Sequence, residues 1–289
     1  MSKISKISYN SIEYPDVLKN IPSPPEKLYV LGDNLSNLLS MPRLSVVGSR
    51  KVSAYGRTTT EQLVKAVASK GVVIISGLAL GVDSIAHNAA LSVRGKTIAV
   101  LPCGLENIYP SSHFHLAKDI LASGGALVSE YEGSTPALKE HFIARNRIVS
   151  GLGDGVLITE AAIKSGTLHT SNFALDQGKT VMAVPGNINS ETSQGTNDLL
   201  KSGATLITEA SDILFALGIN ESTSKQTTLL FGANKDESTI LKLLSTGVTD
   251  GGELLQKSKM NASIFNQTLT MLELNGRIRS LGGGHWTLC

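Results

Sequence analysis

Between residues 43 and 217 the chain alternates short apolar runs with stretches that are long enough to form amphipathic helices. Most of the runs are continuously apolar, which is typical of strands that are buried on both faces of a sheet. Gly71, Gly124 and Gly178 follow helix-length stretches, at places where helix C-caps are expected. This rhythm predicts an α/β fold with a Rossmann-like, doubly wound and mostly parallel sheet. The expected strands are RLSVVGS, GVVIISG, KTIAVLP, GALVSEY, GVLITEA, KTVMAVPG and ATLITEA.

The pattern changes on both sides of this core, which spans residues 43–217. Residues 1–42 contain the proline-rich segment IPSPPEKLYVLGD and are predicted to form an N-terminal extended arm with a short strand around residues 28–31. Residues 218–235 lose the apolar rhythm and are predicted to be a polar linker. Residues 236–289 combine three helical patterns with two short strands around a glycine turn. That order predicts a small C-terminal winged-helix domain, and a helical domain without a particular function is the alternative.

Composition restricts the class of protein. Of the 289 residues, 41% are hydrophobic and 17% are charged, which is enough apolar content for a substantial core and excludes wholesale disorder. The 26 Lys and Arg residues nearly balance the 24 Asp and Glu residues, leaving a formal charge of +2. This balance excludes a histone-like polycation. It allows a local anion site, because electrostatic binding depends on where the charges lie.

The cysteines and the N-terminus indicate a cellular compartment. Cys103 and Cys289 are too few for a disulfide framework and lack metal-ligand spacing, which favours free thiols in a reducing cytosol. The N-terminal segment MSKISKISYNSIEYPDVLK contains no continuous apolar region of the kind found in secretory signals. No run reaches the roughly 18–20 apolar residues needed to span a bilayer. We therefore expect a cytoplasmic protein with no membrane association.

Many of the 28 glycines follow expected strands. Ligands of open parallel sheets bind beyond the carboxyl ends of the strands, where glycine allows close backbone approach and helix N-termini present N–H groups to anions. Several such loops indicate a phosphate-binding surface, although tight strand–helix turns use glycine in any α/β fold. The candidate residues are Gly48, Ser49 and Arg50 after the first core strand and Ser76 and Gly77 after the second.

Two segments resemble nucleotide-binding motifs but lack the right context. The GKT triplets at residues 95–97 and 178–180 have Ala90 and Phe173 where a Walker A loop requires its first glycine, and both lead from a helix into a strand. No GxGxxG follows a strand. We therefore predict no ATP hydrolysis, no dinucleotide and no other cofactor.

The segment at residues 136–147, PALKEHFIARNR, carries the densest group of chemically active side chains. In a helix, Lys139, Phe142, Arg145 and Asn146 share one face. Cations beside an aromatic ring suit a nucleic-acid strand, because Lys and Arg neutralise phosphates while Phe stacks on a base. The alternative is a solvated face with a buried Phe.

Two further groups invite chemical interpretation. The loop of Lys164, Ser165, Gly166 and Thr167 lies between a strand and a helix, and its hydroxyls and backbone amides could hold another phosphate. Asp83 and His87 are four residues apart on an expected helix, a spacing that can share a metal. Because no third ligand is evident, we favour a structural hydrogen-bonded pair and predict no metal site.

Taken together, these motifs resemble the DNA-processing protein A family (DprA, also called Smf). The resemblance covers roughly residues 10–217, and the C-terminal module resembles the winged-helix domain of many members. The motifs that carry the resemblance are GSR at residues 48–50, SGLALGVDSIAH, KTIAVLPCGLENIYP, HFIARNRIVSGL and EAAIKSGTLHTSNFALDQGKTVMAVPGN. The chain does not show the N-terminal helical domain that some members carry.

The resemblance implies a bacterial mediator of natural transformation. Such proteins bind and protect incoming single-stranded DNA and load a RecA-type recombinase onto it, and their core forms a homodimer. By position in the family motifs, DNA contacts are implied for Arg50, for Lys139 and Phe142, for Arg145, Asn146 and Arg147, and for the loop from Lys164 to Thr167.

Two other functions are alternatives to this one. Nucleotide phosphoribohydrolases of the LOG type use a PGGxGTxxE loop, and this chain carries Thr170 where their glutamate stands, which removes a group needed for glycosidic cleavage. A double-strand-specific regulator acting through the winged helix is the other alternative. The candidate recognition helix, ASIFNQTLTMLELNG, contains no Arg or Lys, which counts against reading of the major groove.

Overall fold

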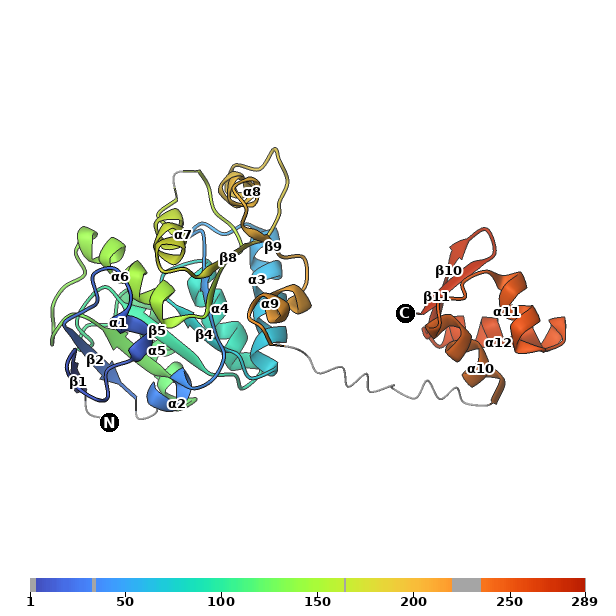
Figure 1. The fold of residues 1–289 in the computed structure, drawn as a ribbon, viewed down its shortest axis with the longest axis horizontal. Coiled ribbons are helices and arrows are strands. Elements are labelled where there is room, and N and C mark those ends of the chain that lie inside the picture. Colours follow the sequence, from blue (N-terminus) through green and yellow to red (C-terminus); the bar gives the residue numbers. More distant parts are fainter. Residues whose placement is uncertain (1–3, 33–34, 164, 220–234, 289) are drawn as a thin grey trace. The chain divides into compact units, whose positions relative to one another are not determined.

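The computed structural model describes residues 4–32, 35–163, 165–219 and 235–288 (Figure 1). The chain forms two compact units, Met1–Asn220 and Glu221–Cys289. Each unit has a hydrophobic core of its own. Among the helices of the described ranges, none has the length and apolar character that crossing a membrane requires.

The first unit contains a sheet of nine strands in its described part, in the order β1-β2-β6-β5-β4-β3-β7-β8-β9. Strand pairs from β6 to β9 are parallel, whereas β1 and β2 are antiparallel to their neighbours. Strands β4, β5 and β6 lie in succession on one side of β3, and β7, β8 and β9 lie in succession on its other side. The direction of the strand order therefore reverses between β3 and β7. The strands are β1 (Ser5–Ser8), β2 (Lys27–Leu31), β3 (Arg43–Val47), β4 (Val73–Ser76), β5 (Thr97–Leu101), β6 (Ala126–Ser129), β7 (Gly155–Ile158), β8 (Thr180–Ala183) and β9 (Thr205–Leu206).

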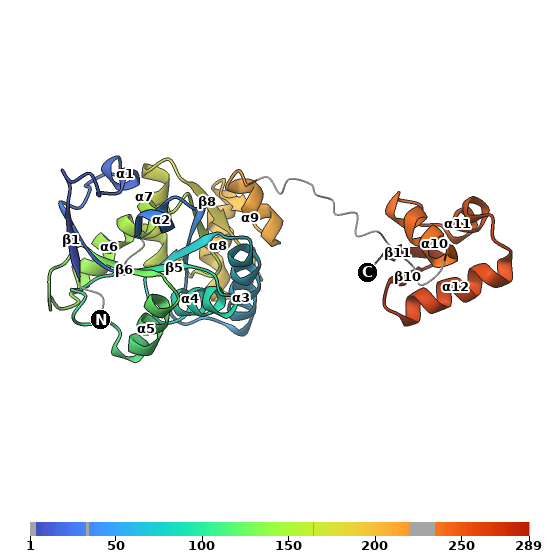
Figure 2. The ribbon, with the colours of Figure 1, turned by 90° about the horizontal axis from the view of Figure 1, so that it is seen from below.

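Helices cover both faces of the sheet, as Figure 2 shows. Apolar side chains of α1, α2, α6 and α7 join the core on one face. Those of α3, α4, α5 and α9 pack on the other face. The helices are α1 (Asp16–Lys19), α2 (Leu35–Leu39), α3 (Ala54–Ser69), α4 (Val82–Ser92), α5 (Phe114–Ala122), α6 (Lys139–Leu152), α7 (Thr167–Asp176), α8 (Gln194–Lys201) and α9 (Ala210–Ala216), with 3₁₀ turns at Ser111–His113 and Glu191–Ser193.

The doubly wound, mostly parallel sheet predicted from the sequence is confirmed. Each of the seven continuous apolar runs contains one of the strands β3 to β9, and β3 to β7 are buried along their whole length. Gly71, Gly124 and Gly178 end helices with φ values of 86°, 78° and 66°. These are left-handed conformations that glycine adopts without a steric penalty.

The N-terminal segment differs from the expected extended arm. Strand β2 agrees with the strand expected around residues 28–31, but β1, α1 and β2 together complete the antiparallel edge of the sheet. The physical reason is apolar burial, since Tyr14, Leu18 and Leu28 are at most 2% exposed. The Tyr14 hydroxyl also donates a hydrogen bond of 2.7 Å to the carbonyl oxygen of Pro25 and so fixes the proline-rich connection against the core.

The second unit is a winged-helix domain, as predicted. It consists of α10 (Lys235–Ser245), α11 (Gly251–Ser258) and α12 (Ala262–Leu274), followed by the antiparallel pair β10 (Ile278–Gly282) and β11 (His285–Leu288). Its core includes Ile240, Leu254 and Phe265. Most of the predicted linker, residues 220–234, lies outside the described residues.

Candidate functional site

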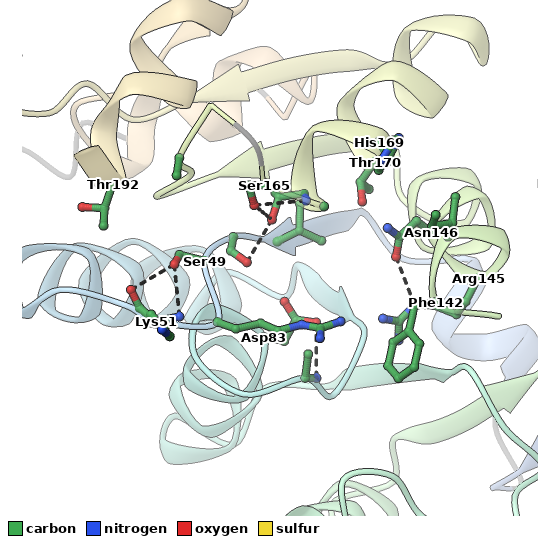
Figure 3. A pocket seen from close by; sticks show the side chains of 18 of the residues that line it. Ser49, Lys51, Asp83, Phe142, Arg145, Asn146, Ser165, His169, Thr170 and Thr192 are labelled. Atoms are coloured by element: carbon green, nitrogen blue, oxygen red, sulfur yellow. Dashed lines mark hydrogen bonds between the residues drawn. The ribbon is translucent and has the colours of Figure 1, made fainter. Parts of the chain in front are cut away.

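A cavity of about 940 Å³ opens beyond the carboxyl ends of β3 and β7, where the strand order reverses (Figure 3). Ligands of doubly wound sheets bind at this kind of position. Its walls come from the loops after β3, β4, β5 and β7, from the first two turns of α6, from the first turn of α7, and from the turn at Glu191–Ser193. The residues that line it and that the sequence singled out as DNA contacts are Gly48, Ser49, Arg50, Lys139, Phe142, Arg145, Asn146, Ser165, Gly166 and Thr167.

The floor of the cavity is a tight junction of the β3 and β7 loops. The backbone N–H of Ser49 donates to the carbonyl oxygen of Glu160 at 2.8 Å, and the Thr167 hydroxyl donates to that of Gly48 at 3.0 Å. A Cβ atom at Gly48 would stand 2.6 Å from Val82 Cγ2 and 2.9 Å from the Glu160 carbonyl oxygen. Glycine is therefore required at position 48 by close packing of the loop against the start of α4.

Exposed cations and an aromatic ring meet at one side of the cavity. Arg50, Lys51 and Lys139 are exposed, and all three line the cavity. The guanidinium carbon of Arg50 lies 5.1 Å from the centroid of the Phe142 ring, a cation–π distance. Because Lys139 lies one turn before Phe142 on α6, this helix presents a cation and a ring to the same space. The arrangement can bind an anion and an aromatic group together.

Arg145 has a different environment from the other cations. Its side chain is 4% exposed, and its guanidinium donates to the carbonyl oxygens of Gly77, at 2.6 Å, and of Val100. The carboxylate of Asp83, which also lines the cavity, accepts the N–H groups of Gly77 at 3.1 Å and Ala79 at 3.3 Å. Arg145 and Asp83 therefore hold the loop after β4 from its two sides.

Burial shifts the pKa values of both groups in the direction that favours their neutral forms. It raises the pKa of the Asp83 carboxyl, although the Arg145 charge and the two N–H donors oppose that rise. It lowers the pKa of Arg145, and the nearby Asp83 charge opposes this change. The opposing effects show that each of the two charges stabilises the other inside the cavity wall.

The structure does not bring three of the predicted contacts to the cavity. Ser76 is fully buried and donates to the carbonyl oxygen of Val46 at 2.7 Å. Arg147 points elsewhere and pairs with Glu130 at 2.6 Å, while its Nε donates to the carbonyl oxygen of Ser23. Gly77 lines a smaller adjoining cavity rather than the large one.

Lys164 and Asn146 are the remaining predicted contacts. Lys164, the first residue of the predicted loop, lies outside the described residues, so only Ser165, Gly166 and Thr167 of that loop are placed in the cavity wall. Asn146 lines the cavity, and its Oδ1 accepts a hydrogen bond of 3.2 Å from Arg145 Nε (Figure 3).

Sequence reasoning missed several residues of the wall. Lys51 directly follows the GSR triplet and could have been found by extending that loop by one residue. Tyr109 lies at the end of the motif KTIAVLPCGLENIYP and could have been found by following the loop after the strand expected at KTIAVLP. Asp83 and Thr170 also line the cavity, and the sequence had singled them out for other reasons. The remaining residues of the wall carry no sequence signal of their own: Val47, Ala79, Ile143, Ala162, His169, Glu191 and Thr192.

Asp83 and His87 do not form the hydrogen-bonded pair that their spacing predicted. Asp83 bonds to the β4 loop, whereas His87 Nδ1 lies 2.6 Å from Thr97 Oγ1 in the core. The two side chains leave α4 toward different partners. In the part of the chain that the structure describes, no three His, Cys, Asp or Glu side chains gather as metal ligands.

Comparison with known proteins gives a family for both units. The family model of DNA recombination-mediator protein A matches residues 5–218, and that of the DprA winged helix domain matches residues 224–284. Protein Smf of Escherichia coli (strain K12) is 46% identical over 201 residues, which cover 70% of this chain and 53% of that protein. DNA processing protein DprA of Bacillus subtilis (strain 168) is 41% identical over 211 residues, covering 73% of this chain and 70% of that protein. The chain thus spans about half the length of the Escherichia coli relative.

Solved structures agree with these matches. DNA processing protein A from Streptococcus pneumoniae superimposes with a TM-score of 0.69 and 39% identity, covering 74% of each chain. The Helicobacter pylori protein, whose structure is described as giving insight into a unique single-stranded DNA binding mode, superimposes with a TM-score of 0.66 and 35% identity over 75% of this chain and 98% of that one. With its sheet, its winged helix and these matches, the chain belongs to the DNA recombination-mediator protein A family, whose members are called DprA or Smf.

Proposed function

We propose that this protein binds single-stranded DNA along the cavity at the switch point of its sheet. The observation that carries the proposal is the convergence of exposed cations with an aromatic ring at one edge of that cavity: Arg50 and Lys139 flank Phe142. In this arrangement the cations neutralise phosphates while the ring stacks on a base, which suits a strand whose bases are unpaired. The single-stranded DNA binding named for the Helicobacter pylori relative supports the same conclusion.

The opposite wall is neutral. The backbone of residues 165–167 leads into the first turn of α7. The Ser165 hydroxyl donates to Thr167 Oγ1 at 3.0 Å, the Thr167 hydroxyl donates to the carbonyl oxygen of Gly48, and the N–H of Thr167 donates to Ser165 Oγ. These groups are engaged within the protein, so a strand crossing the cavity meets its charged donors at Arg50 and Lys139.

The binding experiment measures the affinity for a labelled oligothymidine, by fluorescence anisotropy, between about 50 mM and about 200 mM salt. Each single-strand phosphate contact contributes a log–log salt slope of about −0.7. Arg50→Ala and Lys139→Ala should each weaken binding and flatten the slope by about 0.7. The matched control is Arg94→Ala, which removes an exposed arginine just before β5, at the opposite end of the strands. If both cavity variants bind as tightly and with the same slope as the unchanged protein, the proposed surface is wrong.

We further propose a role in recombination: the protein protects incoming single strands during natural transformation, works as a homodimer and loads a RecA-type recombinase. The family description as a recombination mediator supports this. The test follows nucleation of recombinase filaments on single strands coated with single-strand-binding protein. Addition of this protein should shorten the lag before filaments grow, and Arg50→Ala should restore the lag. Sedimentation of the protein alone reports its oligomeric state.

We propose binding without catalytic turnover. Thr170, at the position of the glutamate of LOG-type enzymes, lies buried in the cavity wall. The Asp83 carboxylate nearby is engaged by two backbone N–H groups, so it is poorly placed to assist glycosidic cleavage. Release of free base from nucleoside monophosphates by the pure protein, abolished by changing residues 165–170, would overturn this part of the proposal.

A further inference from the structure

A second aromatic side chain, Tyr109, lies beside Phe142 at the rim of the cavity. The two ring centroids are 5.5 Å apart, and the ring planes meet at 76°. Phe142 is contacted both by this ring and by the Arg50 guanidinium, and it is only partly exposed. Tyr109 keeps 47% of its surface exposed. Of the two rings, Tyr109 therefore offers more free surface to a ligand.

A small cavity of about 50 Å³ continues the large one past these rings. Arg50, Ala79, Tyr109 and Phe142 line both cavities, and Leu80, Pro102 and Pro110 contribute apolar walls to the small one. Leu80 is itself 52% exposed. Exposed apolar side chains next to a cation match the chemistry of a nucleotide, whose base has apolar faces and whose phosphate is an anion.

The loop that carries Tyr109 is held in place before any ligand arrives. Within it, the Cys103 thiol donates to the carbonyl oxygen of Asn107 at 2.9 Å. The side-chain amide of Asn107 donates to the carbonyl oxygen of Ser134 at 2.9 Å, and the N–H of Glu106 donates to that of Gly133 at 3.1 Å. These bonds join the loop to residues 133–134, so that less conformational entropy is lost when a base packs on the Tyr109 ring.

We propose that Tyr109 is a second base-stacking residue, and that the unpaired base next to the one on Phe142 packs on its exposed ring at the rim of the cavity. The small cavity of about 50 Å³ does not enclose this base, and its apolar walls border the place where the base packs. Arg50 lines both cavities and thus lies where the phosphate between two such bases would pass. Stacking tolerates any base, because every base has a π face, so this subsite lengthens the DNA track without adding sequence preference. The proposal rests on the proposed single-strand binding and names the residue that extends it.

The test compares Tyr109→Ala and Tyr109→Phe in the anisotropy assay with the full chain. Loss of one stacked base weakens binding by about 5- to 150-fold, so Tyr109→Ala should show a loss in this range, with an unchanged salt slope because no phosphate contact is removed. Tyr109→Phe should bind as the unchanged protein does. The matched control is Tyr55→Ala: Tyr55 is 50% exposed, but it borders neither of these two cavities.

A second readout separates stacking from mere support of Phe142. An oligothymidine carrying 5-iodouracil is irradiated on the unchanged protein, and the crosslinked peptide is identified by mass spectrometry. The expected crosslink is to Tyr109. If Tyr109→Ala weakens binding but no crosslink to Tyr109 forms, the residue only positions Phe142 and the subsite is refuted. If Tyr109→Ala binds the oligothymidine normally while Arg50→Ala binds it more weakly, the subsite is refuted and single-strand binding stands. If Arg50→Ala and Lys139→Ala also bind normally, the proposed function itself fails.

Discussion

Replacing Arg145 with methionine tests whether this arginine holds the cavity wall or contacts DNA directly. The change leaves the carbonyl oxygens of Gly77 and Val100 without their guanidinium donor, and it leaves the Asp83 carboxylate without the compensating charge. Removing one partner of a buried charge arrangement costs about 3–5 kcal/mol of unfolding free energy, which already includes the loss of the hydrogen bonds. For a unit of this size, about 2–4 °C of Tm is lost per kcal/mol, so we expect Tm to fall by roughly 6–20 °C.

The chain provides an internal control for this measurement. Its one tryptophan, Trp286, packs against the core of the second unit, so its fluorescence follows the winged helix, whereas far-UV circular dichroism is dominated by the larger first unit. Arg145→Met should lower the circular dichroism transition and leave the Trp286 transition unchanged. Adding Asp83→Asn should recover part of the loss, because the unpaired carboxylate is then neutral. A Tm within about 2 °C of the unchanged protein, together with a collapse of DNA affinity, would refute the structural role and make Arg145 a direct ligand.

Two further predictions concern His87 and Arg147. The Thr97 hydroxyl donates to the carbonyl oxygen of Ile74, so it accepts from His87 Nδ1–H, and burial lowers the pKa of this imidazole from 6.5 to about 3. Between these two pKa values the unfolded chain binds a proton that the folded chain does not, so the free energy of unfolding falls as pH falls. At pH 4.5 the loss is roughly 3 kcal/mol. Urea titrations of His87→Leu should therefore show a smaller difference between pH 7 and pH 4.5 than those of the unchanged protein. A variant that keeps the full pH dependence would contradict this assignment. Arg147→Ala should bind oligothymidine within about twofold of the unchanged protein, because the Arg147 guanidinium is already paired with Glu130. Loss of this pair should lower the free energy of unfolding by about 1–3 kcal/mol. A flattened salt slope in this variant would place Arg147 on the DNA.

The strands of the core could be predicted because their apolar runs are continuous and short, a pattern with few alternatives in an α/β chain. The N-terminal edge could not be predicted in the same way. Its prolines break the local pattern, and strand β2 pairs with a partner far along the chain, Tyr29 opposite Ser129. A segment that gains its order from such a distant strand carries little local evidence of its conformation.

The candidate site could be predicted where its residues lie in regular positions. Strand ends fix the loops that carry Arg50 and Ser165, and helical spacing fixes Lys139 and Phe142 on one face. Tyr109 follows no period. It reaches the cavity because hydrogen bonds fold the loop after β5 onto residues 133–134, and only the folded chain shows that arrangement.

The triplet of Arg145, Asn146 and Arg147 shows why a run of cations in a sequence overstates a binding surface. Successive helical residues turn by about 100°, so three neighbours cannot face one ligand. Arg145 points into the wall, Asn146 lines the cavity and Arg147 pairs with Glu130. Gly77 belongs to the same arrangement, because a Cβ there would collide with the Arg145 guanidinium. That glycine makes room for a buried cation rather than for a phosphate, and the anion-binding charge of this nearly neutral chain is left to the exposed cations around Phe142.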